Sequence, residues 1–283
     1  MCPMQFEKLS LSHRERMEEA RRMAGHTASS HAFTSLFLWS EEKGYTVCFY
    51  ENAFLIKEGE SYFFPCGERE AVASLLRLVL AENPCAVFRF AREEDVAFAK
   101  ELYGERVRAE YDAASREYLY DRAEQIAMPG KRFQYQRAKC NKARRLGEIV
   151  SLPLTRENAK DALFITDEWE KRRNDPADAA MARRALSYTE ALDLIGNVLY
   201  LDGEPIGFDL GAMIAPDTLD NHIAKTLRDD VDTLMKLLWY ESLPDSVRII
   251  NREEDLGIRG LAIHKQDAQP VAFNDTYTLI FEA

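Results

Sequence analysis

The chain has 283 residues, which at about 150 residues per domain predicts roughly two domains. Hydrophobic residues make up 46% and charged residues 30%. This composition excludes global disorder, because a disordered chain has too few apolar residues to form a core. The formal net charge of -11 excludes a protein that coats nucleic acid or anionic membranes without selectivity.

The sequence contains no segment with the features of a membrane span or a secretion signal. The longest stretch without Lys, Arg, Asp or Glu, from Met23 to Ser40, is rich in Ser, Thr and His and too polar to span a bilayer. The N-terminus has neither the basic start nor the apolar run of a signal peptide. The five cysteines show no metal-ligand spacing. We therefore expect a cytoplasmic protein with reduced thiols and no metal site.

The first half of the chain predicts interleaved helices and strands, as in an α+β domain. Ser12 and Glu15 have the spacing of a capping box and predict a helix through about residue 22. The apolar spacing of 68–82 predicts an amphipathic helix, and a further helix is expected over 93–102. Aromatic and β-branched runs predict short strands over 33–39, 45–50, 54–57, 62–64, 85–90 and 116–120.

A basic segment separates the two halves. Pro129 and Gly130 break the chain, and seven Lys and Arg residues follow in fifteen positions, with no acidic residue before Glu148. Because this segment carries +7 within a total of -11, the rest of the chain carries -18. We predict a domain boundary here, with an N-terminal domain over 1–129 and a C-terminal domain over 130–283 that begins with a basic helix at 131–145.

The second half predicts the order helix, helix, hairpin, strand, helix, strand, helix, strand. Asp202 and Gly203, between alternating apolar residues, predict the turn of the hairpin. The helices are expected over 155–173, 177–195, 231–242 and 257–266. The strands are expected over 198–201, 205–214, 222–227, 247–251 and 271–281.

This element order is similar to that of the GNAT acyltransferase fold, and one motif narrows the resemblance. The run N-R-E-E-D-L-G-I-R-G-L at 251–261, followed by Lys265 and Pro270, resembles the closing signature of the lysylphosphatidylglycerol synthetase C-terminal domain family. Gly130-Lys-Arg-Phe133 with Asn141 resembles the basic helix of that family. The stretches 34–39 and 62–67 resemble its N-terminal landmarks, so the resemblance spans nearly the whole chain.

The resemblance implies an α+β chain of two tandem GNAT-like domains, each a mixed, mostly antiparallel sheet flanked by helices. It implies a transferase that moves an aminoacyl or acyl group from a phosphate-rich donor to an amine or hydroxyl acceptor. The implied donor and partner is aminoacyl-tRNA, with acyl-CoA as the other donor, and the implied acceptor is a lipid headgroup or a peptide. No tightly bound cofactor is expected. The alternative is a GNAT-fold binding protein that has lost catalysis.

The sequence departs from the family pattern in three places. The chain lacks the membrane-spanning half of the lipid synthetases, which argues against a lipid acceptor, and Ala224 stands where the family has Glu. The stretch 226–231 lacks the glycine-rich loop with which acetyl-CoA-dependent members bind pyrophosphate through backbone N–H groups. Asp229, Asp230 and Asp232 in and beside that stretch would repel a pyrophosphate, so we expect no ordinary use of acetyl-CoA.

Three candidate catalytic residues follow from this comparison. Asp209, on an otherwise apolar strand, is either the base that deprotonates the attacking amine or a carboxylate hydrogen-bonded at a strand edge. Lys225 stabilises the oxyanion, holds a terminal phosphate or carboxylate, or lies on the surface. Tyr277 is either a general acid or a core residue. We interpret His222 as a half-buried strand histidine rather than as a catalyst.

Two further groups are candidate binding residues. The basic segment suits the phosphates of a donor, with Tyr or Phe to stack on an unpaired base, unless its charges pair with the acidic remainder. The signature residues lie where a strand enters a helix, so they either line a cleft or define the fold. The donor-binding candidates are Lys131, Arg132, Arg137, Lys142 and Arg145, and the cleft candidates are Asn251, Glu253, Asp255 and Lys265.

Overall fold

The computed structural model describes residues 4–282, which form two compact units. The first comprises the chain up to Glu117, the short stretch 254–258 and the chain from Phe273 onward, and the second comprises Tyr118–Glu253 and Arg259–Ala272. The predicted boundary between 129 and 130 lies within the second unit. The chain thus leaves the first unit after Glu117 and returns to it at its C-terminal end, so each unit combines stretches that are distant in sequence.

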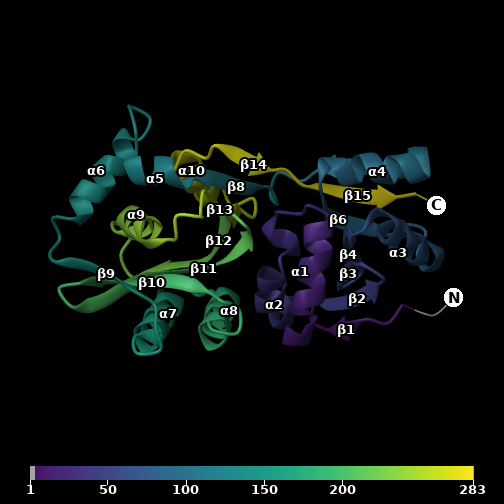
Figure 1. Ribbon diagram of the computed structural model, residues 1–283. Helices are drawn as coiled ribbons and strands as arrows, with labels where there is room; N and C mark the ends of the chain where they lie inside the picture. Colours follow the sequence, from purple (N-terminus) through teal and green to yellow (C-terminus); the bar gives the residue numbers. More distant parts are fainter. Residues whose placement is uncertain (1–3, 283) are drawn as a thin grey trace. The chain divides into compact units, whose positions relative to one another are not determined.

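The first unit is built on a mixed sheet of eight strands in the order β1-β2-β3-β4-β6-β15-β7, with β5 paired to β3 (Figure 1). β4 runs parallel to β6, and β15 pairs antiparallel with β6 and β7. The C-terminal strand therefore completes the sheet of the first unit. The strands are β1 (Glu7–Lys8), β2 (Thr46–Tyr50), β3 (Ala53–Glu58), β4 (Ser61–Phe63), β5 (Cys66–Gly67), β6 (Val87–Ala91), β7 (Val107–Tyr111) and β15 (Tyr277–Phe281).

Four α-helices accompany this sheet in the described part of the first unit: α1 (Arg14–Met23), α2 (Phe33–Lys43), α3 (Arg69–Glu82) and α4 (Glu93–Tyr103). Short 3-10 turns lie at Leu11–His13, Ser29–His31 and Gly104–Arg106. The apolar face of α3 packs on the sheet, with Leu75, Leu76 and Val79 in one core with Phe88 and Phe281. The periodicity of 68–82 therefore predicted both this helix and its buried side.

The second unit is built on a seven-stranded mixed sheet in the order β14-β8-β13-β12-β11-β10-β9. Pairing is antiparallel from β9 through β12, whereas β12 and β13 run parallel. The strands are β8 (Glu117–Asp121), β9 (Ile149–Pro153), β10 (Ile195–Leu201), β11 (Glu204–Ala215), β12 (Thr218–Thr226), β13 (Ile249–Glu254) and β14 (Ala272–Asn274).

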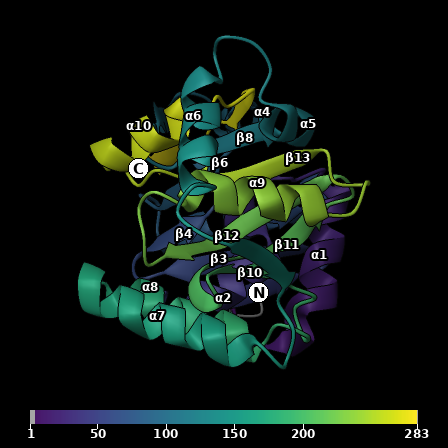
Figure 2. The ribbon, with the colours of Figure 1, turned by 90° about the vertical axis from the view of Figure 1, so that its left-hand side faces the viewer.

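Helices cover both faces of the second sheet. α9 (Asp232–Ser242) lies on one face, and α7 (Ala159–Arg173) and α8 (Pro176–Ser187) lie on the other (Figures 1 and 2). α5 (Arg122–Ala127) and α6 (Gln134–Ala143) pack against α9, and α10 (Arg259–Asp267) follows β13. A hydrophobic core lies under α9, to which α9 contributes Leu234 and Met235. Phe133, just before α6, and Cys140, on α6, pack into the same core, as does Leu199 of β10.

β12 and β13 pair only at their beginnings. Their register runs from Thr218 opposite Ile249 to Asp220 opposite Asn251, although β12 continues to Thr226 and β13 to Glu254. The register between β11 and β12 also shifts at this level, between Leu210 and Ala212. The two parallel strands therefore separate beyond Asp220, and side chains must fill the space between them.

The predicted α+β class, with two mostly antiparallel mixed sheets flanked by helices, is confirmed. The strand predicted over 33–39 is wrong, because these residues form α2, whose apolar side chains are buried on nearly all sides. The helix predicted over 177–195 ends at Ser187, and the last strand over 271–281 is two strands, β14 and β15, in two different sheets. No helix in the described range 4–282 is long and apolar enough to cross a membrane.

Gly211→Ala tests the close packing at the register shift. A Cβ at Gly211 would lie 2.1 Å from the carbonyl oxygen of Asp220 and 3.2 Å from the Trp239 ring. We expect the free energy of unfolding to fall by about 2 kcal/mol or more, because neither neighbour can move freely. Gly260→Ala in α10 is the matched control, since a Cβ there meets open space and helix propensity favours Ala. Equal urea midpoints for the two variants would contradict this packing.

Candidate functional site

Asp209 and Lys236 form a buried ion pair where β11 faces α9. Asp209 is fully buried, and Lys236 Nζ lies 3.1 Å from its Oδ1 and 3.5 Å from Asn221 Oδ1. Burial raises the pKa of the Asp209 carboxyl, and the ammonium of Lys236 opposes that shift. Asp209 Oδ2 is buried and has no hydrogen-bond partner among residues 4–282. One oxygen of a carboxyl with a raised pKa is thus left to accept a proton.

Asp232, His264 and Arg252 extend this pair into a charged network. Asp232 lies one helical turn before Lys236, with 3.5 Å between its Oδ1 and Lys236 Nζ. His264 Nε2 lies 3.2 Å from Asp232 Oδ2 and 3.2 Å from Arg252 Nη2. Burial would raise the pKa of Asp232, but Lys236, His264 and Arg252 outweigh it and hold that pKa well below its usual range. Asp232 is therefore ionised at neutral pH.

A small cavity of about 30 Å³ lies beside this network. It has room for about one water molecule or one small polar group. The hydroxyl of Tyr240 is buried without a hydrogen-bond partner within the described chain. Charged and hydrogen-bonding side chains line the cavity, among them Lys139, Asp232, Lys236, Tyr240, Arg252 and His264. A reacting carbonyl would meet several positive charges and donors here.

The signature residues shape the end of β13. Glu253 has a left-handed backbone with φ +57°, which costs a residue with a side chain about 1–3 kcal/mol. Asn251 Oδ1 accepts the Glu253 N–H at 2.8 Å, and Lys265 Nζ donates to the carbonyl oxygens of Arg252 at 2.6 Å and Glu253 at 3.1 Å. These bonds hold the strained turn, from which the Glu253 carboxylate reaches His222 Nδ1 at 2.9 Å.

Asp255 has a separate and local role. Its Oδ1 accepts the N–H of Gly257 at 2.8 Å, and its carbonyl accepts the N–H of Ile258 at 2.9 Å. Gly257 has φ +70°, a conformation that glycine adopts without strain. Asp255 therefore forms the turn before α10, which agrees with the fold-defining interpretation of this part of the signature.

The structure separates Lys225 from Asp209. Asp209 pairs with Ala224, and Lys225 pairs with the neighbouring Phe208, so the two side chains point to opposite faces of the sheet. Lys225 is buried on the face of α7 and α8, with Nζ 2.8 Å from Asp178 Oδ2 and 3.6 Å from the Trp169 ring centroid. The expectation that Asp209 and Lys225 act on one carbonyl is corrected by this placement, and so is the surface alternative for Lys225.

Tyr277 belongs to β15 in the first unit. It is half-buried there, and its ring lies 5.7 Å from that of Tyr111 on the paired strand. The charged network around Asp209 consists of residues of the second unit. Tyr277 and the network thus belong to different units, and the packing of Tyr277 within the first unit resembles the core alternative.

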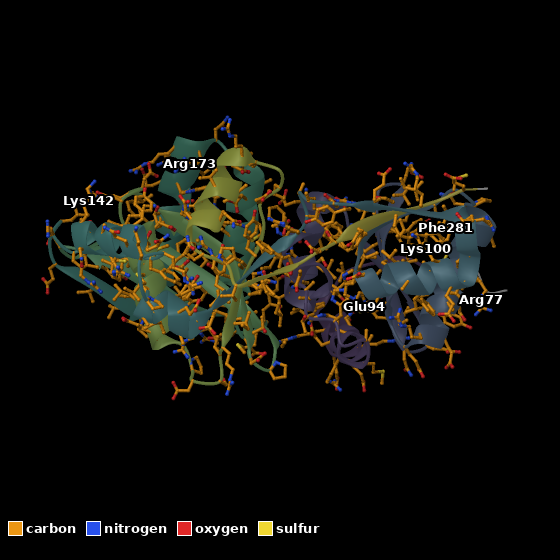
Figure 3. The ribbon with its side chains drawn as sticks, turned by 90° about the horizontal axis from the view of Figure 1, so that it is seen from above. Arg77, Glu94, Lys100, Lys142, Arg173 and Phe281 are labelled. Atoms are coloured by element: carbon orange, nitrogen blue, oxygen red, sulfur yellow. The ribbon has the colours of Figure 1, made fainter. Side chains whose placement is uncertain are left out.

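The basic segment divides into structural and exposed charges. The predicted helix 131–145 is shorter, since α6 spans only Gln134–Ala143. Arg132 forms an ion pair with Glu124, and Arg137 donates to the carbonyl oxygens of Met128 and Gly130. Four of the five candidates are nevertheless exposed, Arg132 among them, and Figure 3 shows the side chain of one, Lys142, extending outward. The exposed four are Lys131, Arg132, Lys142 and Arg145.

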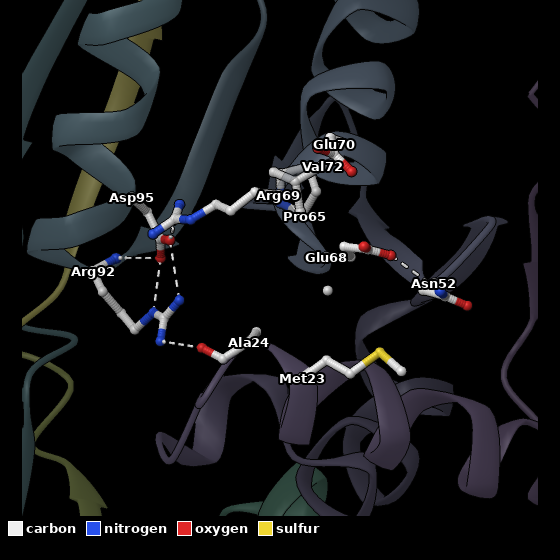
Figure 4. Close-up of a pocket in the computed structure, with 11 residues that line it drawn as sticks. Met23, Ala24, Asn52, Pro65, Glu68, Arg69, Glu70, Val72, Arg92 and Asp95 are labelled. Carbon is white, nitrogen blue, oxygen red and sulfur yellow. Dashed lines mark hydrogen bonds and ion pairs between the residues drawn. The ribbon is translucent and has the colours of Figure 1, made fainter.

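The first unit has a larger cavity of about 630 Å³. Arg92 and Asp95 form a two-pronged ion pair on one side of it, and Arg92 also donates to the Ala24 carbonyl (Figure 4). On the other side Asn52 donates to Glu68 at 3.1 Å. Because these polar groups already bond to one another, this cavity presents little unpaired charge to a ligand, and the second unit holds the stronger candidate site.

Four residues of the network were not predicted from the sequence: Asp232, Lys236, Arg252 and His264. The signal for two of them was visible, because Asp232 and Lys236 have i,i+4 spacing on an otherwise apolar helix. Arg252 lies inside the signature, between the candidates Asn251 and Glu253. Nothing in the sequence near His264 indicated its contact with Asp232.

Residues 21–280 match the family model for the C-terminal region of phosphatidylglycerol lysyltransferase. A conserved protein of unknown function from Bacteroides thetaiotaomicron superposes with TM-score 0.86 at 24% identity, over 99% of this chain and 100% of that one. L-PGS from Bacillus licheniformis superposes with TM-score 0.60 at 16% identity, over 87% and 90% of the chains. A tandem GNAT protein from the clavulanic acid biosynthesis pathway superposes with TM-score 0.51 at 12% identity, over 99% of each chain.

These similarities show the fold: the chain has the tandem GNAT architecture that its element order predicted. No curated protein matches the chain in sequence.

Lys236→Met tests whether the buried pair is a true charge pair. The change leaves Asp209 without its cation, and we expect the free energy of unfolding to fall by about 3 kcal/mol or more. The double variant D209N/K236M should recover part of that loss. Arg156→Met is the control, because the Arg156–Glu190 pair is exposed, with side-chain exposures of 81% and 64%, and its loss should leave the urea midpoint close to that of the wild-type protein.

The pH dependence of K236M gives a second readout. When the pKa of a carboxyl is higher in the folded protein than in the unfolded chain, where it is about 3.9, the protonated carboxyl stabilises the fold at pH values below 3.9. This stabilisation is lost as the pH rises through the pKa of the folded state. The deficit of K236M relative to the wild-type protein should therefore shrink as the pH is lowered from about 7 to about 5, since Asp209 then takes up a proton. A deficit that is constant over this range, or that grows, would contradict the assignment.

Proposed function

Because the chain belongs to the phosphatidylglycerol lysyltransferase C-terminal family, we propose that it transfers an aminoacyl group from aminoacyl-tRNA to an amine or hydroxyl acceptor. The observation that carries this proposal is the buried Asp209–Lys236 pair beside the split between β12 and β13. A carboxyl with a raised pKa and one oxygen without a partner suits the removal of a proton from an attacking nucleophile.

In the proposed reaction the acceptor attacks the ester carbonyl of the donor. The new bond to the acceptor forms, Asp209 takes the proton of the nucleophile, and the carbonyl oxygen becomes an oxyanion. Lys236, Arg252 and the Tyr240 hydroxyl, which line the small cavity, supply positive charge and a hydrogen bond to that oxygen. The ester C–O bond then breaks, and the proton passes from Asp209 to the leaving ribose hydroxyl, so that the carboxylate is regenerated.

Lys236 and Arg252 replace Lys225 in this mechanism, because Lys225 lies on the other face of the sheet. Both are held by contacts of their own. Lys236 contacts Asp209 and Asp232, and Arg252 lies over the Tyr120 ring, with its Cζ 5.2 Å from the ring centroid. Groups fixed before the reaction cost little reorganisation when charge develops. Holding donor and acceptor together supplies much of the remaining rate.

The exposed part of the basic segment supports a nucleic-acid donor. Lys142 and Arg145 are exposed, and so is Tyr135 at 57%, with Lys139 Nζ 4.5 Å from its ring centroid. Lys and Arg contact phosphates, and an exposed Tyr can stack on an unpaired base. α6 packs against α9, which carries Asp232 and Lys236. A single-stranded end of tRNA bound on α6 would therefore lie near the candidate site.

The N-terminus of α9 argues against a CoA donor. Pyrophosphate binding there would use free N–H groups and positive potential. Asp232 is the first residue of α9, Asp230 pairs with Arg228, and Asp229 pairs with Arg173 at 2.9 Å. Carboxylates thus occupy the place that a pyrophosphate would need. The alternative function, a binding protein without catalysis, is favoured by the complete burial of Asp209 and is an outcome of the transfer assay below.

The double variant K142E/R145E tests tRNA binding. We expect affinity for tRNA to fall at least about tenfold and the slope of log affinity against log salt to decrease by about two, because two phosphate contacts are lost. The control K8E/K100E makes the same charge change at two exposed lysines of the first unit. Equal losses in both variants, measured by salt-dependent filter binding, would refute a specific role of the basic segment.

Asp209→Asn tests the base. In a single-turnover assay with lysyl-tRNA and vesicles of phosphatidylglycerol, or an amine-bearing peptide, we expect transfer to slow by about 100-fold. Asp178→Asn, next to Lys225 on the opposite face, should transfer at close to the wild-type rate. If D209N and D178N are equally active, Asp209 is not the base. If the wild-type protein binds tRNA but transfers to neither acceptor, the binding-protein alternative holds.

A further inference from the structure

A second cluster of chemically active side chains lies at the split between β12 and β13. Asp220 is the last residue of β12 that pairs with β13. His222 follows two residues later on β12, and Glu253 lies on β13. His222 Nδ1 is 2.9 Å from Glu253 Oε1 and 3.5 Å from Asp220 Oδ2. The proposed transfer mechanism uses none of the three. The sequence predicted no metal site, because the spacing of its cysteines follows no ligand motif.

The spacing of these atoms suits one metal ion. One potential ligand atom of each residue lies within 4.8 Å of the other two. Ligand atoms bound at about 2.0–2.2 Å to a four-coordinate zinc lie about 3.3–3.6 Å apart. The observed separations of 2.9 and 3.5 Å lie close to this value, so small side-chain shifts would bring all three atoms to bonding distance.

The cluster is also buried and fixed. The side-chain exposures are 0% for Asp220, 3% for His222 and 23% for Glu253, so water reaches the cluster mainly at Glu253. Asn251 and Lys265 hold Glu253 in its strained left-handed conformation, which aims the carboxylate at His222. Strain of this kind persists where the surrounding structure enforces it and is concentrated at functional sites.

His222 has an unmet hydrogen-bonding requirement in this arrangement. Its Nε2 is buried without a hydrogen-bond partner in the described part of the chain, while Nδ1 faces both carboxylates. Nδ1 is therefore the ring nitrogen that would bind a cation, and the ring proton would then be on Nε2. Two carboxylates around one imidazole also concentrate negative charge, which a divalent cation would neutralise.

We propose that Asp220, His222 and Glu253 bind one divalent transition-metal cation, with zinc as the best-matched ion. One nitrogen and two carboxylate oxygens form a donor set that suits zinc, whereas magnesium and calcium take oxygen ligands alone. Three protein ligands would leave a fourth position for water or another small ligand. The site would tie β12 to β13 where their backbone pairing has ended, and it is independent of the proposed transfer activity.

The test is a calorimetric titration of the metal-free full-length chain with ZnCl2. Cys2 and the exposed Cys85 are first replaced by Ser, so that their thiols do not capture zinc. We expect one saturable site per chain, an increase in Tm at saturation, and no such increase with MgCl2. His222→Gln and Glu253→Gln should each weaken zinc binding by at least about tenfold.

His13→Gln is the matched control. His13 also lies beside a carboxylate, with 3.3 Å between its Nε2 and Glu7 Oε1, but it is not part of a three-ligand group. H13Q should bind zinc like the parent chain. If H222Q does not fold, E253Q decides the matter, because its partly exposed side chain tolerates the change best. The absence of a saturable site, or equal affinity in E253Q and H13Q, would overturn the proposal.

Discussion

The separation of β12 from β13 after Asp220 and Asn251 is the constraint on which the candidate site depends. Parallel strands that part leave backbone groups and interior space that need polar partners. The chain meets this need with charged side chains: Lys265 bonds the carbonyl oxygens at the end of β13, and Lys236 reaches Asp209 from α9. The charged network at this place in the second unit is therefore a consequence of how the strand pairing ends.

The two faces of the second sheet use buried charge differently. On the face of α7 and α8, Lys225 pairs with Asp178 and stacks on Trp169, an arrangement whose contacts are complete. On the face of α9, one oxygen of Asp209 and the hydroxyl of Tyr240 have no hydrogen-bond partner among the residues that the structure describes. Complete pairing stabilises a fold, whereas incomplete pairing costs stability and is retained where chemistry or binding uses it. This difference is the reason why the proposed transfer site lies on the α9 face.

The sequence predicted the features that depend on local pattern. α3 follows from apolar periodicity, the β10–β11 hairpin from Asp202-Gly203, and the family from its closing signature. It did not predict α2, because a helix buried on nearly all sides has the same apolar run as a strand. It also could not place the C-terminal strand in the first sheet, since that pairing joins residues far apart in sequence.

The candidate site was predicted only in part, because residue types are visible in the sequence whereas contacts between distant residues are not. Asp209 and the signature residues are recognisable by type and motif, but the face to which each side chain points depends on register. The sequence did not show that Lys225 and Asp209 point to opposite faces. Lys236 was not predicted because it comes from α9, which follows later in the chain. The geometry at Glu253 depends on a left-handed φ that side-chain identity does not reveal.

The pH dependence of single-turnover transfer tests the central claim most directly. After subtraction of uncatalysed ester hydrolysis, we expect the wild-type rate to rise with pH through an apparent pKa above the ordinary Asp value of about 3.9, because Asp209 must be ionised to accept a proton. This rise of the rate with pH, the acidic limb of the pH–rate profile, should be absent from D209N. The same limb in both proteins would show that another group removes the proton and that Asp209 only supports the fold.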